Sequence, residues 1–138
     1  MKTVRKGIIG EHKVIIDLLE KGWDVYTPVV DDGGGVDLIS ICLDCAWTIQ
    51  VKYQHFKRNE HKTSWDIRVK PTRADYIAIP IMVEDDEHIL YYPHFGKSTE
   101  NKSGTGICIS VKEPKNKQVK NINWWEDFLH LPKEEING

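Results

Sequence analysis

Four polar side chains in the first 52 positions have the chemistry to hold a divalent metal ion and activate water: Glu11, Asp37, Gln50 and Lys52. Mg²⁺ takes oxygen ligands, typically one or two carboxylates together with waters and substrate phosphate oxygens. Glu11 and Asp37 supply carboxylates, Gln50 supplies a neutral amide oxygen, and the backbone carbonyl of Val51 offers a further ligand. Lys52 adds a cation that can orient or help deprotonate a water and offset charge on a phosphate. The set suits phosphodiester hydrolysis.

A predicted β-hairpin over Gly34–Gln54 carries three of these residues. Its arms are Val36–Cys42 and Trp47–Tyr53, which are rich in β-branched and apolar residues, and Leu43–Ala46 supplies the reversal. Asp37 stands near the beginning of the first arm.

Side chains alternate between the two faces of a strand, so Gln50 and Lys52 project to one side and Val51 to the other. If Asp37 lies across from them, three polar groups converge on one face of an otherwise apolar hairpin. Packing alone gives no reason for that arrangement.

An amphipathic helix is predicted over Thr3–Lys21, ending at Gly22. Its apolar stripe recurs at helical spacing and comprises Val14, Ile15, Leu18 and Leu19. Glu11 is in line with that stripe. It is either an edge residue that reaches water through its flexible stem, or a carboxylate aimed into a site shared with the sheet.

The rest of the chain predicts strands over Trp23–Pro28, Trp65–Val69, Tyr76–Val83, His88–Tyr92 and Ile107–Val111, a loop or short helix over Gln54–Ser64, and a short closing helix over Asn123–Leu131. This order of elements predicts a single α/β domain over residues 1–138, with a mixed central β-sheet flanked by helices.

Composition places the chain among soluble globular proteins. It has 138 residues, of which 40% are hydrophobic and 29% charged, an ordinary size and balance for one domain. No apolar run approaches the roughly 20 residues that span a bilayer, and the basic N-terminus is not followed by the apolar core of a signal peptide. Three cysteines, an odd number, fit reduced thiols. We therefore expect an intracellular, cytoplasmic protein without a membrane partner.

Charge is unevenly distributed. The formal net charge is −2 and the pI about 6.3, which counts against a strongly basic nucleic-acid binder. The segment from Lys52 to Arg73, however, contains seven basic and two acidic residues, so its formal net charge is 7 − 2 = +5. Such a segment can hold a polyanion, although single lysines often do no more than solvate loops.

Cys42 and Cys45 form a Cys-x-x-Cys pair. A structural zinc site needs about four ligands and usually a second paired motif, yet only Cys108 and six histidines without metal spacing remain. We expect no structural zinc, and a turn between strands is a poor setting for a redox pair because it lacks a helix N-terminus.

These motifs together resemble the PD-(D/E)xK nuclease superfamily. The similarity runs from about Ile8 to Pro93 and rests on an Asp that opens one strand, a residue-x-Lys tripeptide on the next, and a Glu on a preceding helix. Its segments, in chain order, are Gly10-Glu11, Gly22-Trp23, Val36-Asp37-Leu38-Ile39, Gln50-Val51-Lys52-Tyr53, Ala74-Asp75-Tyr76-Ile77 and Tyr91-Tyr92-Pro93.

Within the superfamily the chain looks most like the group I intron homing endonucleases of cyanobacterial type, which also have Gln in the third motif, and next like the archaeal Holliday-junction resolvases. Two positions depart from the common pattern: Val36 replaces the usual proline, and Gln50 replaces the usual acid. One charge fewer weakens metal affinity and gives Glu11 more weight.

The resemblance implies a restriction-endonuclease-like core and Mg²⁺-dependent (or Mn²⁺-dependent) hydrolysis of DNA by a homodimer or homotetramer. The basic residues that would then contact DNA phosphates are Lys57, Arg58, Lys62, Arg68, Lys70 and Arg73. Two other classes of protein stay open: a non-catalytic nucleic-acid-binding module on the same scaffold, and an α/β interaction domain in which Asp37 and Lys52 form only an ion pair.

Overall fold

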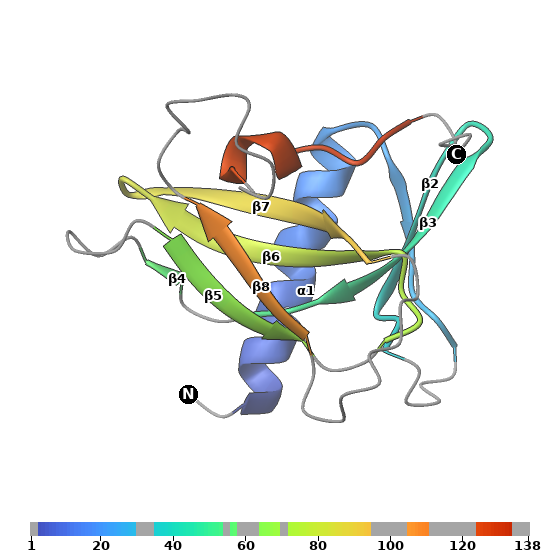
Figure 1. Ribbon diagram of the computed structural model, residues 1–138. Coiled ribbons are helices and arrows are strands. Elements are labelled where there is room, and N and C mark those ends of the chain that lie inside the picture. The colour runs from blue at the N-terminus through green and yellow to red at the C-terminus, as the bar shows by residue number, and fades with distance from the viewer. Residues whose placement is uncertain are drawn as a thin grey trace.

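One long helix lies against a mixed β-sheet whose other face is covered by a two-stranded ribbon (Figure 1). This computed structural model describes residues 3–29, 35–53, 56–57, 64–69, 72–94, 105–110 and 124–133. The elements are α1 Thr3–Glu20, β1 Asp24–Tyr26, β2 Leu38–Cys42, β3 Cys45–Val51, β4 Phe56–Lys57, β5 Ser64–Val69, β6 Tyr76–Val83, β7 Asp86–Pro93, β8 Thr105–Ser110 and the 3₁₀ turn η1 Trp125–Phe128.

The main sheet has six strands in the order β1-β2-β3-β6-β4, with β7 paired to the other edge of β6. The pairs β1–β2, β2–β3 and β6–β7 are antiparallel, whereas β3 and β4 both run parallel to β6. The predicted mixed α/β sheet is therefore confirmed. Strands β5 and β8 form a separate antiparallel ribbon.

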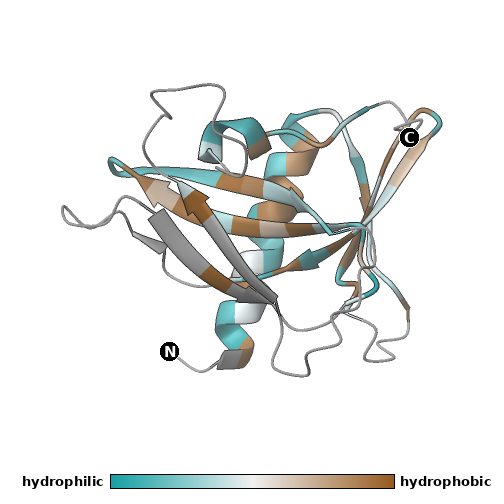
Figure 2. Cartoon of the chain, viewed as in Figure 1, coloured by the Kyte–Doolittle hydropathy of each residue, from teal (hydrophilic) through white to brown (hydrophobic). Residues whose placement is uncertain are grey.

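Two apolar cores follow from the alternation of side chains along β6. Tyr76 and Ala78 face α1 and pack with Val14 and Leu18, while Ile77 and Ile79 face the ribbon and pack with Ile67 and Ile109. Both faces of β6 are buried, as expected for a strand with parallel neighbours. Figure 2 shows apolar residues along β6 and β7, and among them Ile77, Ile79 and Leu90 are fully buried.

The β2–β3 hairpin is confirmed, with a tighter reversal than predicted. Cys42 pairs directly with Cys45, so only Leu43 and Asp44 form the turn, and Leu43 adopts a positive φ of 53°. The second arm gains Cys45 and Ala46 at this end and stops at Val51, before Lys52 and Tyr53. The first arm ends at Cys42 as predicted but begins at Leu38, after Val36 and Asp37.

Three details of the prediction were wrong. Phe56–Lys57 is a short strand beside β6 instead of loop or helix. The closing helix shrinks to η1, because Trp124 is held in a bridge to Ser110. Leu19 is 55% exposed, so the buried stripe of α1 is narrower than the sequence pattern suggests. No helix in the described part of the chain has the length and apolar character needed to cross a membrane.

Candidate active site

Asp37 is fixed to strand β3 by two hydrogen bonds. Its backbone N–H donates to the carbonyl of Ile49 at 2.8 Å, and its Oδ2 accepts a hydrogen bond from the backbone N–H of Val51, also at 2.8 Å. Leu38 pairs with Ile49 and is the last residue of the ladder at this end, so Asp37 lies just beyond the paired strands, beside the end of β3. That Asp37, Gln50 and Lys52 converge on one face of the hairpin stays a prediction.

Gln50 projects toward the face of the sheet that the β5–β8 ribbon covers. Gln50 is in register with Ile77 of β6, and Ile77 belongs to the core beneath the ribbon. Ile49 and Leu38 point the opposite way, into the core under α1. Neighbouring residues of the hairpin thus point to opposite faces of the sheet, with polar Gln50 on one face and apolar Ile49 and Leu38 on the other.

The side chain of Gln50 has a polar atom whose hydrogen-bonding capacity is not satisfied. Its side-chain Oε1 is buried and has no hydrogen-bond partner. Leaving a buried polar atom unpaired costs about 1–3 kcal/mol, and such atoms are uncommon in folded proteins. A buried amide oxygen without a partner is a suitable ligand for a hard cation.

Helix α1 reaches the end of β3 through a very close contact at Gly10. A Cβ atom on Gly10 would lie 2.6 Å from the Cβ of Tyr53 and 2.9 Å from its Cγ, so only glycine allows this approach. Lys13, one turn later, lies over the Tyr53 ring at 5.6 Å from its centroid. Half-buried Glu11 follows Gly10 directly, so it lies on the helix side at the end of β3, next to the segment that carries Lys52.

Lys52 follows β3 and remains attached to β6, because its backbone N–H donates to the carbonyl of Ala78 at 2.9 Å. Its side chain is half-buried.

The segment just before β6 holds both halves of the hairpin in place. Thr72, which is 5% exposed, donates its hydroxyl to the carbonyl of Gly35 at 3.0 Å. Gly35 has a φ of +78°, and a Cβ there would lie 2.4 Å from Thr72 Oγ1. This contact fixes the chain two residues before Asp37.

Asp75 performs the same task for β3. Its Oδ2 accepts hydrogen bonds from the backbone N–H of Thr48 at 3.0 Å and from the Thr48 hydroxyl at 3.1 Å, and its own N–H donates to the Thr48 carbonyl at 2.9 Å. Thr48 stands two residues before Gln50 on the same face. Asp75 therefore fixes the position of Gln50 relative to β6.

The residues at this end of the sheet fit a metal ion held by mixed oxygen ligands. No group of three His, Cys, Asp or Glu side chains lies together in the described ranges, so carboxylates and imidazoles alone do not form a site there. The carboxylate of Asp37 and the unpaired amide oxygen of Gln50 are hard donors that belong to the same hairpin, and they are of the type that Mg²⁺ and Mn²⁺ prefer.

Comparison with known proteins identifies the scaffold. The sequence profile of the PD-(D/E)XK endonuclease family matches residues 1–131. The chain belongs to this family. The solved structure of a bacterial homing endonuclease, I-Ssp6803I, has the same fold, with a TM-score of 0.58 and 22% sequence identity over 84% of this chain and 80% of that chain. The curated proteins contain no match.

Family membership suggests which residues of the hairpin to compare with the family's motif. The family name describes an acid on one strand and an acid-x-Lys motif on the next. The sequence prediction assigns these positions to Asp37, Gln50 and Lys52. The restriction-endonuclease-like fold expected from the sequence is confirmed. Gln50 departs from the family name, and it is the residue whose side-chain oxygen is left without a partner.

Of the six predicted DNA contacts, Arg73 alone has a described side chain. It is exposed and lies between Thr72 and Ala74, close in the chain to the residues that hold the hairpin. The backbones of Lys57 and Arg68 lie in β4 and β5. Arg58, Lys62 and Lys70 are outside the described residues.

Sequence reasoning overlooked Thr72 and Asp75 as supports of the site. The only signal was the segment Ala74-Asp75-Tyr76-Ile77, which contributed to the family resemblance without a role. Their importance depends on which strand pairs with β3, and that pairing joins segments about 27 positions apart.

Proposed function

We propose that this protein is a divalent-metal-dependent DNA endonuclease with its active site at the end of β3. The observation that carries the proposal is the buried, unpartnered Oε1 of Gln50, in the same hairpin whose end holds the Asp37 carboxylate against Val51. Asp37 and Gln50 would bind Mg²⁺, or Mn²⁺ in its place, with the Val51 carbonyl and the Glu11 carboxylate completing the protein ligands. A bound ion would supply a Lewis acid that lowers the pKa of a water and offsets charge on the phosphate.

Each side chain has a separate task in this proposal. The Val51 N–H holds Oδ2 of Asp37 in a fixed orientation. The conformational entropy of that ligand is therefore lost during folding and not when substrate binds. Lys52 Nζ donates hydrogen bonds to the attacking water and to a phosphate oxygen, which keeps them in line and stabilises the developing charge. Arg73 binds a neighbouring phosphate and adds affinity without reading bases.

Two active sites in one assembly can reach both strands of a duplex, so we also propose that the enzyme is a homodimer or homotetramer. Large apolar side chains on α1 remain at least half exposed and would suit a contact between copies: Val4 (75% exposed), Ile8 (52%), Ile16 (55%) and Leu19 (55%). Sedimentation of the wild type beside Ile8→Glu would show a change of mass if this face joins subunits.

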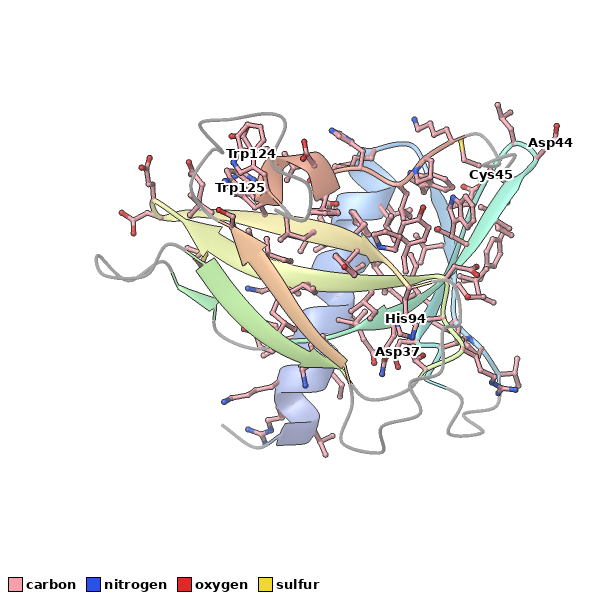
Figure 3. The ribbon with its side chains drawn as sticks, viewed as in Figure 1. Asp37, Asp44, Cys45, His94, Trp124 and Trp125 are labelled. Atoms are coloured by element: carbon pink, nitrogen blue, oxygen red, sulfur yellow. The ribbon has the colours of Figure 1, made fainter. Side chains whose placement is uncertain are left out.

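A cleavage assay with a matched control tests the active site. Supercoiled plasmid and branched DNA are incubated with Mg²⁺ or Mn²⁺ and with wild type, Asp37→Ala, Lys52→Ala or Asp44→Ala. Asp44 is an exposed carboxylate at the tip of the same hairpin, at the end opposite Asp37 (Figure 3). We expect Asp37→Ala and Lys52→Ala to lose about a hundredfold or more of the cleavage rate, and Asp44→Ala to keep it.

The assay also separates the alternatives. Cleavage that survives both Asp37→Ala and Lys52→Ala would remove this site from consideration. DNA binding that weakens with salt, without any cleavage, would indicate a non-catalytic binding module.

A further inference from the structure

His94 is a buried histidine that has no place in the mechanism above. It follows β7 directly, is 7% exposed, and its Nε2 has no hydrogen-bond partner. Its backbone N–H donates to the carbonyl of Asp75 at 2.7 Å. The same Asp75 holds Thr48 through its carboxylate, so one residue connects His94 to the strand that carries Gln50.

The strand register sets His94 on the active-site face. Tyr76 pairs with Pro93, and one further step sets Asp75 beside His94. Tyr92 pairs with Ile77, which is in turn in register with Gln50. Because residues two apart share a face, His94 lies on the same face as Gln50. In the view of Figure 3, His94 and Asp37 project to the same region of the molecule, away from Asp44 and Cys45 at the hairpin tip.

The unpaired atoms of Gln50 and His94 are complementary. They are the buried side-chain nitrogen and oxygen atoms found without a partner among the described residues, and both lie on one face. Gln50 Oε1 accepts only, so a cation satisfies it. A neutral imidazole protonated on Nε2 donates a hydrogen bond, so an oxygen atom satisfies it. A phosphodiester bound next to a metal ion supplies that oxygen.

We propose that His94 is a substrate-binding residue of the active site, whose Nε2–H donates a hydrogen bond to a non-bridging oxygen of the DNA phosphate. This inference rests on the proposed function and adds a residue to it. The hydrogen bond forms only when substrate is bound. A donor that is prearranged for substrate has no partner in the protein alone, as is the case for Nε2 of His94. Asp75 is then a positioning residue for both Gln50 and His94.

Three variants test the role of Nε2. His94→Phe keeps an aromatic ring without a donor, and His94→Gln restores an N–H donor. His88→Phe is the control, because His88 belongs to the same strand β7 but stacks on Trp125 with ring centroids 4.9 Å apart. We expect His94→Phe to lower the cleavage rate about a hundredfold, His94→Gln to recover part of it, and His88→Phe to keep it.

Stability separates a substrate contact from a packing role. Replacing a buried, unpaired polar group by an apolar ring removes a desolvation cost, so His94→Phe should melt no lower than wild type. A His94→Phe variant that cleaves at the wild-type rate would overturn the proposal. So would a variant that loses activity only in step with a lower melting temperature.

A measurement that needs no cleavage keeps the inference independent of the proposed function. The ring C–H resonance of His94, assigned by its absence from His94→Phe, is followed by NMR as Ca²⁺ and then a short DNA duplex are added. We expect a shift with DNA and none with Ca²⁺ alone. A shift with Ca²⁺ alone would make His94 a metal contact and overturn the phosphate role. If wild type cuts no DNA, the proposed function fails, and this resonance still decides whether His94 contacts DNA.

Discussion

Replacement of Gly10 by alanine tests whether helix α1 must approach β3 as closely as the structure shows. Two glycines of α1 differ only in their surroundings. A Cβ at Gly7 would meet nothing within 4 Å, whereas one at Gly10 would lie 2.6 Å from the Cβ of Tyr53. The obstacle at Gly10 is the base of the Tyr53 side chain, which cannot rotate away. Gly7→Ala is therefore a matched control.

The two substitutions should change stability in opposite directions. Alanine gains about 1 kcal/mol over glycine within a helix, so Gly7→Ala should raise the free energy of unfolding by about that amount. Gly10→Ala has the same gain but also an overpacking cost of about 1–3 kcal/mol. At the upper end of that cost it is less stable than wild type by about 2 kcal/mol. A difference of about 3 kcal/mol between the variants corresponds to about 10 °C in melting temperature for a domain of this size.

The assays are thermal unfolding for stability and DNA cleavage at a temperature where every variant is folded. Because Glu11 follows Gly10, a shift of α1 away from Tyr53 moves its carboxylate from the end of β3. We expect Gly10→Ala to lose cleavage as Glu11→Ala does, and Gly7→Ala to retain it. Equal melting temperatures and equal cleavage rates for the two glycine variants would refute the close packing of α1 on Tyr53.

Three further predictions concern the site and its supports. Gln50→Glu should tighten Mg²⁺ binding, measured by titration calorimetry, by about tenfold or more, because an added unit charge near the ion contributes up to about 4 kcal/mol at an effective dielectric constant near 20; unchanged affinity would exclude Gln50 as a ligand. Thr48→Val should lower the free energy of unfolding by about 1–3 kcal/mol, because it removes a hydroxyl bonded to Asp75, and Thr48→Ser should keep most of it; equal losses would contradict that role. Stability should also fall as pH rises above 10.0, because burial raises the pKa of Tyr76 from 10.0 to about 12, and burial with the Asp17 hydrogen bond raises the pKa of Tyr91. The folded protein thus retains protons that the unfolded chain loses, and denaturant titrations of Tyr76→Phe should show a weaker alkaline loss.

The sequence predicts the local part of the site well. The β2–β3 hairpin that carries Gln50 forms as predicted, because the alternation of side chains and the reversal between its arms are local features that need no knowledge of the remaining chain. The family resemblance and the fold are also confirmed. Glu11, Val51 and Lys52 stay predictions as site residues, because their roles depend on an ion and a substrate.

The non-local part was not predictable from patterns. Which strand joins β3 in parallel is decided by the packing of β6 between two cores, so the supporting roles of Thr72 and Asp75 and the placement of His94 could not be deduced. Helical periodicity likewise gives no signal that Trp124 is captured by a bridge to Ser110, which leaves η1 as one short turn.

The parallel pairing of β3 with β6 has a consequence for the timing of activity during synthesis. A nascent chain that ends before residue 72 already contains Glu11, Asp37, Gln50 and Lys52, and its hairpin can form locally. It lacks the Thr72 contact to Gly35 and the Asp75 contacts to Thr48. If the chain cuts DNA as proposed, an incomplete nascent chain is harmless to the genome. It becomes catalytically competent only after Thr72, Asp75 and strand β6 have been synthesised and hold the hairpin in place.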